Sequence, residues 1–167
     1  NLSETVEKTS VFQPIWLSGG ELLVTEDRSG WWNLMMLDTK IDQSDIPVWR
    51  RIWPMESETA LPQWVYGMST TSPAGEKIIS ASCNNGCWRI NLLTCDGSIC
   101  EFEQPFDDLA GIHAENNRVV AIASNCLTEP GLLEIDLSVG SWSHTAVRKP
   151  VIEEDQISVP ESFWFEG

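Results

Sequence analysis

Three stretches of the sequence share one pattern: DRSGWWNLMMLD at residues 27–38, NNGCWRINLLTCDG at residues 84–97 and EPGLLEIDLSVG at residues 129–140. Each stretch places a glycine just before an apolar strand, and each strand ends in a polar turn. The glycines Gly30, Gly86 and Gly131 are 56 and 45 residues apart. These separations bracket the length of a four-stranded propeller blade with its connections. The repeat therefore predicts about three successive blades.

The segments around these stretches are short, apolar and rich in β-branched or aromatic residues, with turn residues between them. This pattern predicts an all-β protein, a partial β-propeller of about three four-stranded antiparallel blades. The expected strands are 12–16, 21–25, 32–37 and 48–53; then 63–66, 77–82, 88–93 and 99–102; then 111–114, 118–124, 132–137 and 142–147. The expected turns include 72–75, 84–86, 96–97 and 129–131. Asn-Gly and Asp-Gly supply the positive φ angles of tight hairpins, so 84–86 and 96–97 are the clearest turns.

These strands divide the chain into segments. Residues 1–10 are expected to be a leader or connector, and three blades follow at 11–56, 61–104 and 109–148. Residues 149–167 depart from the strand pattern and contain the acidic run Glu153-Glu154-Asp155. They are predicted to be a connector.

Composition narrows the possible functions. The chain has 167 residues, 42% of them hydrophobic, which is enough to bury a core. A net charge of −15 repels phosphate backbones and anionic lipids, so we expect no nucleic-acid partner. No apolar run approaches the roughly 20 residues of a membrane helix. The first ten residues lack the features of a secretory signal, so either the chain is cytoplasmic or its true N-terminus is missing. Five cysteines, an odd number, also favour a reducing compartment.

The sequence predicts no catalytic residues in this chain. His113 and His144 fall in or beside expected strands, and neither accompanies a nucleophile motif. Ser143 precedes His144, but adjacent strand residues face opposite sides of a sheet. No Gly-x-Ser-x-Gly motif occurs, and the nearest strings are SGG at 18–20 and GSWSH at 140–144.

We also expect no metal and no cofactor. Cys83 and Cys87 flank one turn and Cys95 and Cys100 the next, so four thiolates are conceivable zinc ligands. Structural zinc sites usually have the tighter Cys-x-x-Cys spacing. Small buried or free thiols are the favoured interpretation.

Acidic and aromatic residues have ordinary explanations as well. The acid pairs 107–108 and 153–154 are expected to be solvated loop residues, although glycosidases also use two facing acids. Most of the nine tryptophans are assigned to core and blade-to-blade packing. Trp31 and Trp32 are consecutive and should point to opposite faces, so one of them is expected at an interface or the surface.

Three segments resemble a known protein family: FQPIWLSGGELLVTEDRSGWWNLMMLD at 12–38, LPQWVYGMS at 61–69 and ISVPESFWFEG at 157–167. They resemble the propeller of the prolyl oligopeptidase family, in the branch of acylaminoacyl peptidases and dipeptidyl aminopeptidases. The resemblance implies a propeller that caps an α/β-hydrolase domain, with the Ser-Val-Pro-Glu segment just before that domain. No part of a hydrolase domain is present in this sequence.

The resemblance also implies a function for the chain within a larger enzyme. The chain would be a non-catalytic segment that gates substrate access and scaffolds a serine peptidase, and 149–167 would lead toward the hydrolase domain. Its partners would be that domain and the peptide substrate of the parent enzyme. The alternative is a free-standing propeller module that binds a protein or ligand.

Three blades are fewer than the four to eight of a closed propeller, so two blade faces should be left open. We expect Trp16, Trp32 and Trp53 on the first face and Leu133, Ile135 and Leu137 on the last. Open apolar faces favour association, so a homodimer is also expected.

Overall fold

The structure of the chain is a computed structural model that describes residues 9–37, 48–62, 64–94, 97–163 and 165. The described residues form twelve strands and one 3-10 helix, so the predicted all-β class is confirmed. The elements are β1 (Val11–Trp16), β2 (Leu22–Glu26), β3 (Asn33–Leu37), β4 (Trp49–Trp53), β5 (Thr71–Ala74), β6 (Lys77–Asn84), β7 (Cys87–Thr94), β8 (Ile99–Phe102), β9 (Asp108–Glu115), β10 (Arg118–Asn125), β11 (Thr128–Asp136), β12 (Ser141–Ala146) and η1 (Glu154–Gln156).

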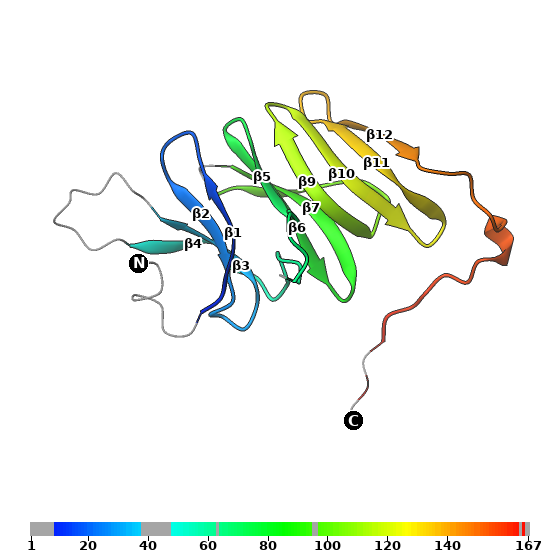
Figure 1. Cartoon of the computed structure of the whole chain (residues 1–167), viewed down its shortest axis with the longest axis horizontal. Coiled ribbons are helices and arrows are strands. Elements are labelled where there is room, and N and C mark those ends of the chain that lie inside the picture. The colour runs from blue at the N-terminus through cyan, green and yellow to red at the C-terminus, as the bar shows by residue number, and fades with distance from the viewer. Residues whose placement is uncertain (1–8, 38–47, 63, 95–96, 164, 166–167) are drawn as a thin grey trace.

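The strands form three separate four-stranded sheets, and within each sheet every strand pairs antiparallel with the next in the chain. We call β1–β4 the first sheet, β5–β8 the second and β9–β12 the third. Figure 1 shows the sheets side by side in chain order. Three consecutive meanders arranged in this way are consecutive blades of a partial propeller, as the repeat predicts.

The first strands of successive sheets are neighbours. The Ser69 hydroxyl donates a hydrogen bond to the Ile112 carbonyl at 2.7 Å, and the Ile112 amide donates to the Ser69 carbonyl at 3.0 Å. The Ala114 amide donates to the Ser72 hydroxyl at 2.9 Å. These bonds join the segment around β5 to β9. The Gln13 side chain of β1 in turn donates to the Thr71 carbonyl of β5 at 2.7 Å, so β1, β5 and β9 lie on one side of the sheets, which we call the inner edge.

The predicted hairpin between β6 and β7 is confirmed. Asn84 pairs with Cys87, and the two residues between them, Asn85 and Gly86, have φ angles of 51° and 78°. Two successive positive φ values define the type I′ turn that matches the twist of antiparallel strands. The Asn-Gly pair is the local cause of this hairpin.

The predicted strand at 63–66 is wrong. Residues 64–66 form an exposed turn, Gln63 lies outside the described residues, and the first strand of the second sheet is β5, where a turn at 72–75 was predicted. Hydrogen bonds from the neighbouring sheets hold this polar strand: the Gln13 side chain donates to the Thr71 carbonyl at 2.7 Å, and the Ala114 amide donates to the Ser72 hydroxyl at 2.9 Å. Pro73 is tolerated because β5 is an edge strand.

The third glycine of the repeat also differs from its expected role. Gly30 and Gly86 lie in turns with φ angles of 89° and 78°, whereas Gly131 lies inside β11. Its place is explained by packing, because a Cβ atom there would come within 2.3 Å of the Thr145 carbonyl oxygen. The turn of the third sheet lies earlier, between Asn125 and Thr128.

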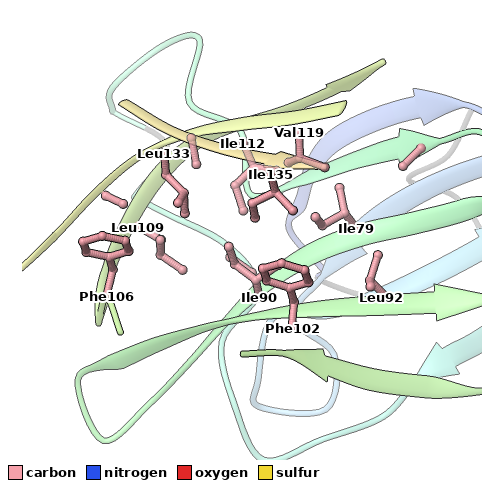
Figure 2. Close-up of a cluster of buried hydrophobic side chains, with 14 residues drawn as sticks. Ile79, Ile90, Leu92, Phe102, Phe106, Leu109, Ile112, Val119, Leu133 and Ile135 are labelled. Carbon is pink, nitrogen blue, oxygen red and sulfur yellow. The ribbon is translucent and has the colours of Figure 1, made fainter. Parts of the chain in front are cut away.

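The main core lies between the second and third sheets (Figure 2). Ile79 and Ile90 of the second sheet face Val119, Leu133 and Ile135 of the third, and all five are at most 1% exposed. Burying each such side chain contributes roughly 1.5–3 kcal/mol before conformational costs. A smaller cluster joins the first and second sheets through Leu23, Leu34 and Leu93.

This core corrects the predicted open faces. Leu133 and Ile135 are buried against the second sheet, and Leu137 packs against the same cluster. The outward face of the third sheet instead carries Ile122 and Leu132, which pair with one another and are 50% and 40% exposed. A one-residue change of position along a strand reverses the face of every side chain, which is why the prediction failed.

The first sheet also differs from the prediction, because only one of the three tryptophans expected on its open face lies there. Trp53 packs in the cluster that faces the second sheet, and the Trp32 ring meets Phe12 edge to face, with ring centroids 6.4 Å apart. Of the three predicted tryptophans, Trp16 pairs with Leu22 on the outward side and is 66% exposed.

Candidate docking face

One end of the sheets carries the turns between β2 and β3, between β6 and β7, and between β10 and β11. We call this end the turn face and define it by residues 27–32, 84–87 and 125–128, together with residues 54–62 and 64–70 between β4 and β5. Backbone hydrogen bonds at this end join the first sheet's connection to the second sheet, and the second sheet to the third. Each turn belongs to the second hairpin of its own sheet, so equivalent turns of the three sheets lie at this end.

Glu58 ties the first sheet to the second at the turn face. Its carboxylate accepts a hydrogen bond from the Trp32 amide at 2.9 Å, and its backbone forms a bridge with Cys83 through bonds of 2.9 and 2.7 Å. The second sheet is joined to the third in a similar way. The Trp88 amide donates to the Asp107 carbonyl at 2.9 Å, and the Asp107 amide donates to the Ser124 carbonyl at 3.2 Å.

Large aromatic side chains project from the connection on this face. Trp64 is 82% exposed and Tyr66 is 95% exposed, and Gly67 follows with a φ of 78°. The turn lies beside β1, where a hollow of about 310 Å³ is lined by Phe12, Gln13, Val65, Tyr66 and neighbouring residues. Aromatic rings exposed to this degree are the side chains that protein interfaces most often use.

The turn between β2 and β3 adds a third aromatic ring. Trp31 is 38% exposed, while Trp32 packs on Phe12. One of the pair, Trp31, therefore lies at the surface, as predicted. Leu127 of the turn between β10 and β11 is 37% exposed on the same face.

The C-terminal segment returns to the turn face after leaving the third sheet. The Ser162 hydroxyl donates a hydrogen bond to the Asn85 carbonyl at 3.1 Å, and Glu161, Ser162 and Phe163 line a shallow hollow with Asn85 and Gly86. Figure 1 shows this segment running from β12 past η1 toward the end of the second sheet. Phe163 and Phe165 remain 78% and 80% exposed, so they extend the aromatic surface.

Cys83 and Cys87 lie at the same hairpin but do not face each other. Cys83 pairs with Trp88 and Cys87 with Asn84, so the two thiols lie on opposite faces of the sheet. Burial raises the pKa of the Cys83 thiol, and the nearby Cys87 and Glu58 raise it further against a lowering hydrogen bond from Gly86. A thiol with a raised pKa is a weak nucleophile at neutral pH, because little thiolate is present.

The other predicted candidates are dispersed. Cys100 is exposed in β8, and Cys95 lies outside the described residues. In the part of the chain that the structure describes, no three His, Cys, Asp or Glu side chains gather in a way that could hold a metal ion. Within the same residues, no helix has the length and apolar character that a membrane crossing requires.

Both histidines lie in strands of the third sheet. His113 is an exposed residue of β9 that pairs with Val120. The Nε2 atom of His144 lies 3.0 Å from the Ala123 carbonyl oxygen, and its ring packs on Phe106 with centroids 4.5 Å apart. That carbonyl and that ring account for the position of His144 in the sheet.

The paired acids are divided between a hydrogen-bonded strand end and an exposed segment. The Asp108 carboxylate accepts a hydrogen bond from the Ser124 hydroxyl at 3.1 Å, and Asp107 joins the second and third sheets through its backbone. Glu153 and Glu154 are exposed at the start of η1.

The sequence did not identify the exposed turn at 64–66, because its aromatic content was interpreted as a strand. Pro62 before it and Gly67 after it were the available indications of a turn.

Comparison with known proteins finds no matching family model and no matching curated protein. Solved structures do match. A puromycin-hydrolyzing peptidase of Mycobacterium tuberculosis aligns with 87% of this chain at 22% identity and a TM-score of 0.73. A puromycin hydrolase aligns with 87% of it at 23% identity and a TM-score of 0.75. Prolyl oligopeptidase B from Galerina marginata, solved with a 25mer macrocyclization substrate, aligns with 89% of it at 14% identity and a TM-score of 0.68.

The chain spans about a fifth of each matched protein, 20–22% of their lengths. At these identities the comparisons establish the fold. The resemblance inferred from the sequence is thus confirmed as a resemblance of structure, and the chain has the fold of a three-blade propeller segment of the kind found in peptidases of the prolyl oligopeptidase type.

Proposed function

We propose that this chain is a non-catalytic propeller segment of a serine peptidase of the prolyl oligopeptidase type. In this proposal it scaffolds an α/β-hydrolase domain and restricts the entry of substrates to that domain. One observation carries the proposal: 87–89% of this chain matches the solved structures in fold, and the match covers about a fifth of the length of each of those proteins. The placement in a reducing compartment rests on the cysteine content and belongs to the same proposal.

The turn face is the surface that would dock the hydrolase domain. Tyr66 lies at the inner edge beside β1, exposed Trp64 belongs to the same turn, and the C-terminal segment is hydrogen-bonded to the same face. A domain connected through that segment would therefore lie over these rings. Rings at the inner edge would also line the path by which a peptide enters, which gives them a role in gating.

The experiment uses the complete protein encoded by the gene that contains this chain. A serine-directed fluorophosphonate should label that protein and should not label the 167-residue chain. The double variant Trp64→Ser, Tyr66→Ser should lower the preference for a short peptide over a long unfolded protein by several fold in kcat/KM, because the narrowed entrance is lost. Trp16→Ser is the matched control, since Trp16 is 66% exposed but lies on the outward side of the first sheet.

Two results would contradict the proposal. If the complete protein has no fluorophosphonate-reactive serine, the chain is the alternative, a propeller module that binds a protein or ligand. If the double variant and Trp16→Ser keep the same substrate preference as the unaltered protein, the turn face does not gate entry.

A further inference from the structure

A cleft opens between the first and second sheets at the end opposite the turn face. Its volume is about 660 Å³, within the range of small-molecule sites. It lies between the turn that joins β1 to β2 and the turn that joins β5 to β6. The second and third sheets, by contrast, are closed against each other by the main core.

The floor of the cleft is aliphatic and comes from both sheets. Leu93 of the second sheet is 4% exposed, and Met36, Ile52 and Ile78 are partly buried beside it. A bound peptide would bring amide groups that these side chains cannot hydrogen-bond, at a cost in free energy. A hydrocarbon chain has no such groups. The floor therefore favours a ligand with a hydrocarbon body.

Each of the two sheets contributes one basic side chain to the exposed rim of the cleft. Arg50 of β4 and Lys77 at the start of β6 are exposed and line the cleft, and neither has an ion-pair partner among the described residues. By contrast, four other arginines each pair with a carboxylate: Arg28, Arg89, Arg118 and Arg148.

Glu21 and Glu76 also line the rim, so the rim as a whole is not cationic. The carboxylate of Glu21 is folded over its own turn, where a Cβ atom at Gly19 would lie 2.3 Å from its oxygen. Because the rim has no net positive charge, an anion must contact Arg50 and Lys77 directly in order to bind. Substitution of these two residues tests that requirement.

We propose that this cleft binds an amphipathic anion with a hydrocarbon body, of the class of medium-chain carboxylates. The hydrocarbon lies on the aliphatic floor, and the carboxylate lies between Arg50 and Lys77. The proposal does not rest on the peptidase assignment, because it concerns a different end of the sheets and a different ligand.

The probe is decanoate, titrated into the 167-residue chain below its micelle concentration and followed by calorimetry and tryptophan fluorescence. Trp53 packs in the cluster that forms the floor, so its emission should change on binding. Decanol and decyltrimethylammonium have the same tail with no charge and a positive charge. Decanoate should bind most tightly and the cation most weakly. Equal affinity for all three, or no binding of decanoate, would overturn the proposal.

Substitutions locate the site. Arg50→Gln and Lys77→Gln should each weaken decanoate binding about two- to fivefold, the range of an exposed ion pair. Arg51→Gln is the matched control, because Arg51 pairs with Met35 on the other face of the first sheet, whereas Arg50 pairs with Met36. Ile99→Trp should occlude the cleft, and Ile122→Trp places the same ring on the third sheet. If Arg50→Gln, Lys77→Gln and Ile99→Trp all bind decanoate like the unaltered chain, the ligand adsorbs elsewhere and the proposal is wrong.

Discussion

At the scale of single residues, Gln13 carries the connection between the first and second sheets. It lies in β1 with a φ of 47°, a left-handed conformation that is uncommon for residues other than glycine. Its side-chain amide donates to the Thr71 carbonyl at 2.7 Å and accepts from the Thr70 and Thr71 amides at 3.0 and 3.3 Å. Nothing in the sequence around Gln13 indicates this conformation, because it depends on partners 57 and 58 residues away.

Replacing Gln13 should therefore separate backbone strain from the loss of the amide. Gln13→Ala should destabilise the chain by about 1–3 kcal/mol, because Thr70 and Thr71 are at most 2% exposed and would lose hydrogen-bond partners. Gln13→Gly should cost about 1 kcal/mol less than alanine, since glycine adopts the positive φ without strain. Urea unfolding measures the free energy of unfolding of both variants. A value for Gln13→Ala within about 0.5 kcal/mol of the unaltered chain would show that the amide does not hold the sheets together.

At the scale of elements, hairpins with a local cause could be predicted and strands with a distant cause could not. The turn between β6 and β7 follows from Asn85-Gly86 alone. The strand β5 has the polar sequence TSPA, and it is extended because it bonds to β6 and adjoins β9. The candidate docking face was missed for the same reason. The exposure of Trp64 and Tyr66 depends on where the connection lies, which no local pattern records.

Gly131 is required by the close approach of β12, a contact distant in sequence, and this explanation can be tested. Gly131→Ala should destabilise the pairing of β11 with β12 by about 2 kcal/mol or more, because the new Cβ would meet backbone atoms of Thr145 and Ala146 at 2.3 and 2.6 Å. Gly30→Ala is the control. It has open space around it and a φ of 89°, so it should cost only about 1 kcal/mol of backbone strain. Thermal unfolding followed by circular dichroism compares the two. Equal losses would mean that close strand approach does not explain the glycine in β11.

At the scale of the whole molecule, the third sheet presents an outward face that nothing in the described part of the chain covers at Ile122 and Leu132. In a longer propeller this face would pack against another blade. In the isolated 167-residue chain we propose that it pairs two copies. The net charge of −15 opposes this association, and salt screens that repulsion, with a Debye length of about 10 Å at 0.1 M and about 3 Å at 1 M.

The chain should therefore be largely monomeric at low salt and should shift toward dimer as salt rises, as sedimentation velocity would show. Ile122→Glu should abolish the dimer at every salt concentration, because it places a charge in the centre of the apolar contact. Val139→Glu adds the same charge in the turn between β11 and β12, where Val139 is already 73% exposed, so salt should still restore its dimer. A strictly monomeric chain at all salts, or a dimer that Ile122→Glu leaves intact, would show that the outward face of the third sheet is not the contact.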